Sequence, residues 1–493
     1  MTISFNSIPT TLRVPFVAAE FDATRAQQGP ALLAYKALLI GQKTSAGTAT
    51  ANTLVRVTSV DQAITYGGRG SMLHRQALGW FASNRSTEVW LGVLADNGAG
   101  VAATGTIVVS GPATADGTIA LYLGAERITI GVTSGDTANT IATAIDDAIN
   151  AALDLPVTST VNTETVTIAF RHKGEVGNTY DVRHSFRDGE ALPAGVGLAI
   201  TAVGSVVAGT TNPTLTSLIA AMADLWFMVW SHPYTDATSL TAIETELASR
   251  FGPLRSIDGI AITSASGSFS TLTTLGDGRN NQHSVIVAQP GASPLTPPME
   301  FAAEAAGLVA LYGAEDPARP FQTLAMSRAV APAETDQWSL DERNLMLYDG
   351  IATTKRVAGG VVQLERIITT YQTSPSGAAD TAYLDATTML TLLYLRYSWR
   401  VRIQTRYPRH KLANDGTRLG SGQAVITPLL GKGEALGWFR EMEALGLVEN
   451  FEQFKRDLVC ARSASDPNRL EWLLPPDLIN QLIVGAAQIQ FRL

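Results

Sequence analysis

Ala37-Leu38-Leu39-Ile40-Gly41 is a short apolar run that ends in glycine, and it indicates what kind of fold the chain adopts. A run without a polar interruption predicts a strand that is buried on both faces, as in a parallel sheet. Further along the chain, Met72–Ser83 carries apolar residues at helical spacing, and Val89–Leu94 is a second apolar run. This order of strand, helix and strand predicts an α/β core.

The same pattern returns from Leu215 onward. The predicted strands are Phe227–Trp230, Asp258–Ile262 and Ser284–Val287, and the predicted helices are Ser239–Phe251 and Met299–Tyr312. Because strands alternate with helices on both sides of the intervening residues, we expect a single mixed, mostly parallel sheet.

Residues 98–210 differ in character from both flanks. They are richer in Gly, Thr, Ala and Ser, and they show short alternating strands around one helix, Thr137–Leu153. Asp136 is the expected N-cap of this helix, and its apolar face is expected to consist of Ile141, Ile145 and Ile149. The segment therefore predicts a self-contained, β-rich inserted domain at the surface.

The C-terminal third mixes helices and strands. Long helices are predicted at Tyr383–Tyr407 and Pro428–Leu445, followed by strands at Asp457–Ala461 and Leu470–Leu474. The predicted layout is an N-terminal arm at 1–28, a discontinuous central α/β domain at 29–97 and 211–375, the inserted domain at 98–210, an α+β domain at 376–478 and a C-terminal arm at 479–493.

Both ends of the chain show apolar alternation without a local hairpin partner. Proline interrupts the first pattern, at Pro9 and Pro15, and the last pattern runs from Ile479 to Leu493. A strand without a local partner needs one from elsewhere, so we expect these arms to pair between subunits. The candidate interface residues are Leu12, Val14, Phe16 and Phe21 in the N-terminal arm, and Ile483, Val484, Ile489, Phe491 and Leu493 in the C-terminal arm.

Composition excludes several classes of protein. Of the 493 residues, 45% are hydrophobic and 16% charged, which predicts packed cores, and the net charge of -8 argues against a nucleic-acid binder. The single cysteine, Cys460, excludes an intrachain disulfide and is expected to be buried in a strand. No leader or membrane span is visible, because Leu215–Trp230, the most apolar window, is too short and contains Asp224. We expect a soluble protein made in a cytoplasm.

Motifs for catalysis or metal binding are not evident. The six histidines lack metal-ligand spacing, so we expect them at the surface or hydrogen-bonded in the core: His74, His172, His184, His232, His283 and His410. The glycines of Tyr66–Ser71 could hold an anion, but a helix-entry turn is favoured, and Leu430–Gly433 lacks the phosphate-loop pattern. Ser264–Ser268 follows a strand without a Gly-x-Ser-x-Gly motif, and Asp146 and Asp147 point apart. These observations predict no metal, no cofactor and no enzyme.

Two charged stretches could serve assembly. The basic stretch comprises Arg396, Arg400, Arg402, Arg406, Arg409, His410 and Lys411, which could compensate a helix dipole or contact an acidic partner. The helix Pro428–Leu445 carries a mixed charged face that could dock electrostatically, comprising Lys432, Glu434, Arg440, Glu441 and Glu443.

Three segments carry a family resemblance. They are Ile3-Ser4-Phe5-Asn6-Ser7-Ile8-Pro9 with Arg13-Val14-Pro15-Phe16 and Glu20-Phe21-Asp22, then Arg171-His172-Lys173-Gly174-Glu175-Val176-Gly177-Asn178, then Leu364-Glu365-Arg366-Ile367-Ile368-Thr369-Thr370-Tyr371 with Asp380 and Tyr383. In this order they resemble contractile tail sheath proteins, in particular those of Mu-like phages, over essentially the whole chain.

The resemblance implies a virion structural protein that assembles in the host bacterial cytoplasm. Such subunits form stacked six-fold rings around an inner tail tube, exchange N- and C-terminal strands with their neighbours, and contract to drive the tube through the host envelope for genome delivery. The central domain of the family has been likened to a subtilisin-type fold, although no protease triad is visible here. Further implied partners are baseplate and tail terminator proteins, and the charged face of 428–445 becomes a candidate tube-facing surface.

Two alternatives stay open. One is the sheath of a non-phage contractile injection system, which sequence alone does not separate from a phage sheath. The other is an enzyme or glycan-binding protein with a β-rich accessory domain, which would form a small closed oligomer instead of concentration-dependent tubes or rings.

Overall fold

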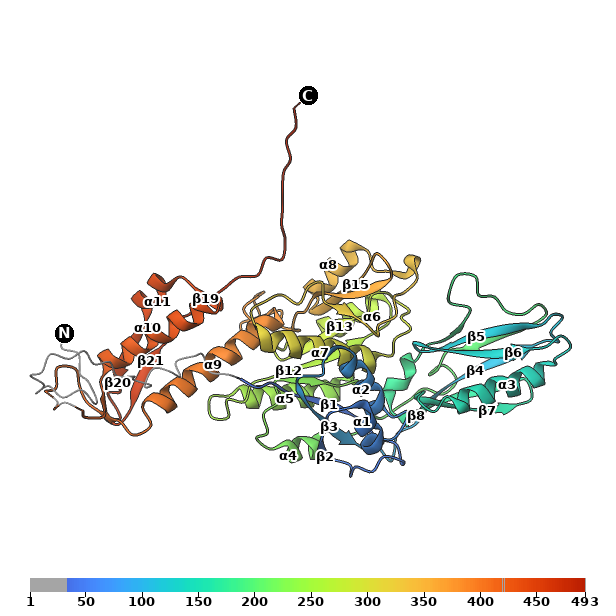
Figure 1. Cartoon of the computed structure of the whole chain (residues 1–493), viewed down its shortest axis with the longest axis horizontal. Coiled ribbons are helices and arrows are strands. Elements are labelled where there is room, and N and C mark those ends of the chain that lie inside the picture. Colours follow the sequence, from blue (N-terminus) through green and yellow to red (C-terminus); the bar gives the residue numbers. More distant parts are fainter. Residues whose placement is uncertain (1–32, 419, 421, 493) are drawn as a thin grey trace, which may run out of the picture. The chain divides into compact units, whose positions relative to one another are not determined.

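The structure is a computed structural model that describes residues 33–418, 420 and 422–492 (Figure 1). Contacts between residues divide it into two compact units. The first comprises residues 34–396, 445–450 and 476–492, and the second comprises 397–444 and 451–475. Each unit is described by itself.

A nine-stranded sheet forms the centre of the first unit, in the order β14-β16-β15-β13-β12-β11-β1-β3-β2. The six parallel strands are β1 (Lys36–Gln42), β3 (Glu88–Leu94), β11 (Val229–Ser231), β12 (Ile260–Ala265), β13 (Ser284–Ala288) and β15 (Ile351–Val357). The antiparallel strands are β2 (Thr53–Val57), β14 (Ala325–Met326) and β16 (Val361–Arg366). The predicted mixed, mostly parallel sheet is therefore confirmed.

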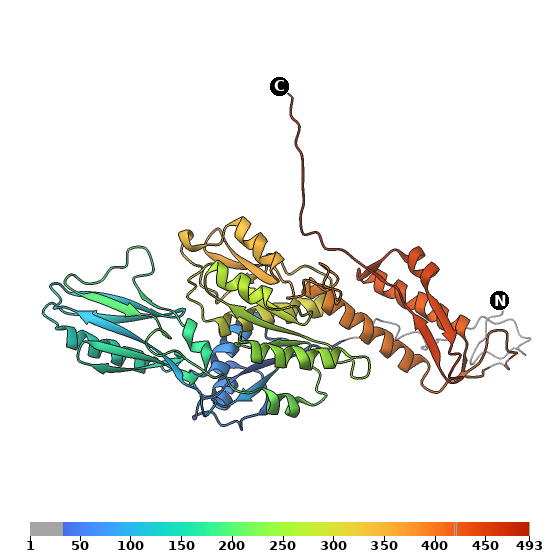
Figure 2. The same ribbon diagram turned by 180° about the vertical axis from the view of Figure 1, so that it is seen from behind.

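Helices cover both faces of this sheet (Figures 1 and 2). On one face lie α2 (Met72–Ser83) and the Ala-rich α7 (Pro298–Glu315), which approach so closely that a Cβ on Gly79 would meet the Glu300 carbonyl oxygen at 2.3 Å. The other face packs side chains of β1 and β11 against α4 (Thr216–Met222) and α5 (Ala237–Phe251), and side chains of β13 against α6 (Phe269–Asp277). Helices α1 (Val60–Gly67) and α8 (Leu340–Tyr348) also belong to this unit.

The inserted segment contains two further sheets. They have the orders β10-β4-β8-β7 and β6-β5-β9 and share one apolar core with α3 (Ala138–Ala151). Their strands are β4 (Ala102–Ser110), β5 (Gly117–Leu123), β6 (Glu126–Val132), β7 (Val157–Asn162), β8 (Thr165–Lys173), β9 (Val182–His184) and β10 (Gly197–Thr201). The predicted buried face of Ile141, Ile145 and Ile149 is confirmed.

The predicted N-cap of that helix is wrong. Thr137, and not Asp136, caps α3, because its hydroxyl accepts the Thr140 N–H while Asp136 accepts the Thr133 N–H in the preceding turn. The alternating pattern of this segment predicts strands at 106–109, 118–123, 127–132, 165–170 and 197–203, so strands β7 and β9 were not predicted from the sequence.

The second unit contains the end of α9 (Ala386–Arg406), together with α10 (Pro428–Ala444) and α11 (Phe451–Asp457). Its strands are β17 (Lys411–Leu412) and β18 (Val425–Ile426), which pair in parallel, and β20 (Val459–Arg462) and β21 (Leu470–Leu473), which pair antiparallel. Trp399 lies edge-on to both Trp438 and Trp472, so three tryptophans join the helices to the sheet. Cys460 lies in a strand, β20, as predicted, but it is half-buried against Gly431, and not buried as expected.

Candidate assembly surfaces

The C-terminal segment is tied to the first unit by a very short pairing. Strand β22 (Asp477–Leu478) pairs antiparallel with β19 (Val448–Glu449), and the Gln481 side chain donates to Thr387. From Ile479 to Arg492 no residue belongs to a strand or a helix. Figure 1 draws these residues as extended chain. That this segment pairs with another subunit stays a prediction.

Large apolar side chains of this segment lie in solvent. The exposed fractions are 76% for Leu482, 79% for Val484, 87% for Ile489 and 80% for Phe491, and Ile483 is half-buried. Burying one such side chain stabilises a protein by about 1.5–3 kcal/mol, so several of them together are a strong driving force for association. Leu493 and the N-terminal candidates Leu12, Val14, Phe16 and Phe21 lie outside the described residues.

A second surface that could take part in assembly is the two-stranded sheet β20–β21. In the part of the chain that the structure describes, no further strand pairs with its outer edges. One face lies under α10, where the Trp472 indole N–H donates to the Gly431 carbonyl. The other face exposes the cross-strand pair Val459 and Leu473. Unpaired edges beside exposed apolar side chains are the features to which an extended segment adds as a strand.

The charged face of α10 is largely engaged within its own unit. Arg402 donates to Glu434 at 2.9 Å and to Glu441 at 2.7 Å, and Arg440 pairs with Glu443 on the same helix. Although burial opposes it, hydrogen bonds from Tyr407 and Arg402 hold the pKa of Glu434 below its usual value. Among the described residues, Lys432 makes no ion pair.

Arginines of the basic stretch form ion pairs within the subunit, which neither of the two interpretations of the sequence included. Arg396 pairs with Asp258 at 2.7 Å, and Arg406 shares Glu434 with Arg402. These ion pairs arise between residues 28 to 138 positions apart, so packing of the chain creates them and spacing in the sequence does not reveal them. Arginines in this stretch therefore stabilise the subunit itself.

The glycine turn before α2 is a helix-entry turn and not an anion site. The Gly70 N–H donates to His74 Nδ1, the Met72 N–H to His172 Nε2, and the His74 N–H to the Ser71 hydroxyl. Because side chains of the protein already accept from these three N–H groups, they are not available to a phosphate. The favoured interpretation of this turn is confirmed.

His172 is engaged at both of its ring nitrogens. His172 donates from Nδ1 to Asp96 at 2.9 Å while its Nε2 accepts from Met72, so neither ring nitrogen is left to act as a base. No group of three or more His, Cys, Asp or Glu residues that could hold a metal occurs among the residues described. The prediction of hydrogen-bonded core histidines is wrong for His232, which is buried with both ring nitrogens unpartnered; burial lowers its pKa to about 4.

The crevice in which α/β proteins bind ligands is filled by the inserted segment. Strand order reverses at β1, which lies between β3 and β11, and ligands of such sheets bind at the carboxyl ends of the strands at this point. Here Gln42 at the end of β1 donates to Asp96 and to the carbonyl of Lys173. His172 also bonds to Asp96, so side chain and backbone of the insertion occupy the crevice.

The C-terminal motif of the family resemblance forms one cluster before α9. The Tyr371 hydroxyl donates to Asp380 Oδ2 at 2.7 Å, the ring of Tyr383 lies edge-on to Tyr371, and Arg366 pairs with Asp385. The hydrogen bond to Asp380, with burial, raises the pKa of Tyr371 to about 12. The motif fixes the path of the chain from β16 into α9. That helix begins at Ala386, three residues later than predicted, after this cluster.

Family comparisons define the class of protein. Residues 208–370 match the model of the phage tail sheath protein central domain, and residues 378–492 match that of the phage tail sheath C-terminal domain. The chain therefore belongs to the phage tail sheath protein family. It is 40% identical over 493 residues, covering 100% of both chains, to the Mu-like prophage FluMu tail sheath protein of Haemophilus influenzae. The predicted family is confirmed.

Solved structures of sheath proteins are also similar to this chain. A sheath tail protein from Desulfitobacterium hafniense has 11% identity and a TM-score of 0.47, covering 94% of this chain and 100% of that one. The sheath complex of an extracellular contractile injection system in its contracted state has 8% identity and a TM-score of 0.48, covering 98% of both. Separately, no helix of the described residues is long and apolar enough to cross a membrane.

Proposed function

We propose that this tail sheath protein polymerises as stacked six-fold rings around an inner tail tube and that contraction of the polymer drives the tube through the host envelope for genome delivery. Membership of the sheath family supports the proposal, and the observation that carries it is the unpartnered apolar C-terminal segment. Assembly takes place in the host bacterial cytoplasm, and the product is part of the virion.

The proposed role is structural and not enzymatic. The crevice at the strand ends is filled by His172 and Lys173, and no histidine combines a free ring nitrogen with a carboxylate partner within the described residues. Neither a cofactor nor a nucleotide has a role in this proposal, because the work of contraction would come from repacking interfaces between two discrete states.

The C-terminal segment is proposed to add as a strand to the β20–β21 sheet of another copy. From Leu478 to Phe491 the chain carries no charged residue, so the segment can enter a sheet edge without burying a charge. Backbone groups would pair in trans while Ile489, Phe491 and Leu493 point to one face. The N-terminal arm, with Leu12, Val14, Phe16 and Phe21, is proposed to exchange in the same way. Each exchanged arm stays covalently attached to its own subunit while it pairs with a neighbour, so the rings could rotate without separating.

The contact with the tube is proposed to lie on α10. Because Glu434 and Glu441 are engaged by Arg402, the side chains best placed to reach a partner are Lys432 and the outward pair Arg440 and Glu443. Further proposed partners are baseplate and tail terminator proteins. The five-part layout, with boundaries at 28, 97, 210, 375 and 478, is kept as the proposed domain organisation.

Deletion of 479–493 tests the proposal. The truncated subunit should stay folded by circular dichroism but fail to form sheath-like tubes by electron microscopy and sedimentation, and deletion of the first 22 residues should have the same effect. Normal tubes from both truncations would contradict strand exchange.

A further inference from the structure

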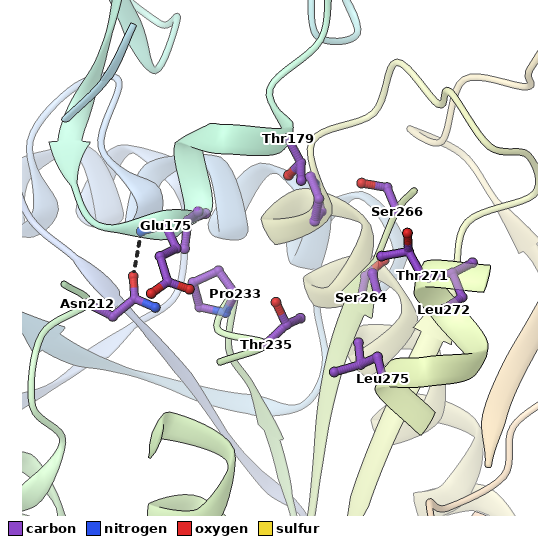
Figure 3. A pocket seen from close by; sticks show the side chains of 13 residues that line it. Glu175, Thr179, Asn212, Pro233, Thr235, Ser264, Ser266, Thr271, Leu272 and Leu275 are labelled. Carbon is purple, nitrogen blue, oxygen red and sulfur yellow. Dashed lines mark hydrogen bonds between the residues drawn. The ribbon is translucent and has the colours of Figure 1, made fainter. Parts of the chain in front are cut away.

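A second cleft lies at the carboxyl ends of β11 and β12. It has a volume of about 230 Å³, and its walls come from the ends of these strands, from α6 and from the short 3-10 helix η2 (Glu175–Thr179) of the inserted segment. Figure 3 shows Glu175 and Thr179 approaching from η2, opposite Ser264 and Ser266. Typical clefts for organic ligands measure 300–1,000 Å³, so this one suits a group of side-chain size.

One wall of the cleft holds a buried hydroxyl without a partner. Ser264 is 1% exposed, and its Oγ makes no hydrogen bond although it lines the cleft. A buried polar group without a partner is unfavourable, and it calls for a group that supplies the missing bond. The hydroxyl can accept a hydrogen bond from whatever enters.

The opposite wall holds a carboxylate without a counter-ion. Glu175 forms no ion pair with any described residue, although its backbone N–H donates to Asn212 Oδ1 at 2.8 Å. The Asn212 amide in turn donates to Asp236 Oδ1 at 2.6 Å, so a second carboxylate lies behind the first. Glu175 is exposed to solvent although it lines the cleft, and partial desolvation, with the nearby charge of Asp236, raises its pKa. An entering cation would relieve this repulsion.

The rest of the lining defines the shape of the ligand. Leu272, Leu275 and Val176 contribute apolar surface, and no basic residue lines the cleft. A group with an apolar stem and a cationic, hydrogen-donating head matches both kinds of wall, and lysine and arginine side chains have this form. A divalent cation fits less well, because Glu175 is the single carboxylate among the lining residues and such ions usually need more oxygen ligands.

We propose that this cleft receives a lysine or arginine side chain of a second copy of the chain. The inference rests on the proposed function, since the polymer brings copies together. Because both the inserted segment and the central sheet line the cleft, one side chain of a neighbour would contact both. This contact would be separate from the exchanged arms. Charge complementarity is the reason for the choice of occupant.

Substitution Glu175→Gln, with Glu164→Gln as its matched control, tests the contact. Glu164 is an exposed carboxylate of the same inserted segment, in the turn between β7 and β8. Sedimentation should show that E175Q raises the concentration needed for polymerisation about tenfold, the effect of losing one charge-assisted pair, while E164Q leaves it unchanged. Added butylguanidinium should raise the wild-type threshold, and butanol should not.

Binding to the dissociated subunit gives the second measurement. Saturation-transfer NMR should detect butylguanidinium on wild-type and E164Q subunits and much less on E175Q and Ser264→Ala. If E175Q polymerises like E164Q, the inter-subunit contact is overturned while the sheath function stands. If butylguanidinium binds but leaves polymerisation unchanged, the cleft takes a free small organic cation, and the proposal that a second copy of the chain occupies it is overturned. Failure of the wild type to polymerise at all would instead contradict the proposed function.

Discussion

The central sheet and the C-terminal segment use similar apolar side chains in opposite ways. Leu38 and Ile40 of β1 are almost completely buried, whereas Ile489 and Phe491 lie almost fully in solvent. Their chemistry is the same, so the difference lies in their contacts: helices of the same chain cover β1, whereas no described residue covers the side chains of Ile489 and Phe491. One region therefore stabilises the subunit, whereas the other is the segment proposed to take part in assembly.

The largest expected effect on the stability of one subunit comes from Trp230→Ala. Trp230 is fully buried, its indole N–H donates to the Phe227 carbonyl, and Arg250 lies over its ring. We expect a loss of about 3–5 kcal/mol in the free energy of unfolding, measured by urea denaturation, because the substitution leaves a cavity and removes these contacts. The control Leu254→Ala removes an almost fully exposed side chain and should change stability by less than about 0.5 kcal/mol.

Acid should weaken the central core through His232. Its pKa is lowered to about 4 in the folded state, whereas an unfolded histidine titrates near 6.5. As pH falls below about 6.5 the unfolded state binds the proton first, so stability falls until about pH 4 and then levels off. Relative to His232→Phe, the wild type should lose about 3 kcal/mol between pH 7 and pH 4 in urea titrations. If the stability of His232→Phe depended on pH in the same way as that of the wild type, the assignment to His232 would be contradicted.

A smaller effect is expected where α9 meets α10 within the second unit. Arg402→Met leaves Glu434 and Glu441 without their shared arginine and should cost about 1–3 kcal/mol at pH 7. The pKa of Glu434 is lowered in the folded state, so the stability that this carboxylate contributes is present above its unfolded pKa and lost as pH falls through the lower folded pKa. The cost of Arg402→Met, measured by urea denaturation, should therefore shrink in acid. Adding Glu434→Gln to the variant should recover part of the loss.

The smallest effect on subunit stability, with the largest on assembly, is expected from the C-terminal segment. The double variant Ile489→Asp with Phe491→Asp should change the free energy of unfolding by less than about 0.5 kcal/mol, because both side chains are exposed in the single chain. It should nevertheless abolish polymerisation in sedimentation, since charges would enter the strand-pairing face. Gln488→Asp with Gln490→Asp adds the same charge on the alternate face and should polymerise. If both double variants polymerised equally well, or both failed to, the apolar face of the C-terminal segment would have no special role in assembly.

Elements with strong local signals could be predicted from the sequence. Helix α2 was predicted with its observed bounds, because its apolar spacing starts directly after the N-cap Ser71. The three-residue strand β9 could not be predicted, because pairing with β5 stabilises it and its own residues show no strand-like alternation that is long enough to recognise. Pairing of the alternating C-terminal segment with another subunit, and the strand that it joins, stay predictions.

Contacts between distant residues could not be read from the sequence. Arg402 and Glu434 meet because two helices pack side by side, and 32 positions separate them. Glu175 and Ser264 face each other across one cleft only because the inserted segment folds back on the ends of the central strands. Spacing in a sequence reports neighbours along one helix or strand, and both pairs depend on how separate elements pack.

The two-residue pairing of β22 with β19 has a mechanical consequence. A neighbour that holds residues 479–492 and moves would put tension on Leu478, and the β22–β19 ladder is the first regular structure to carry that load. Strand β19 lies in the sequence between Ala444, where α10 ends, and Phe451, where α11 begins. Tension on the end of the chain would thus reach the connection between these two helices. A ladder this short can yield at low force, so it would act as a compliant joint that lengthens before any domain unfolds.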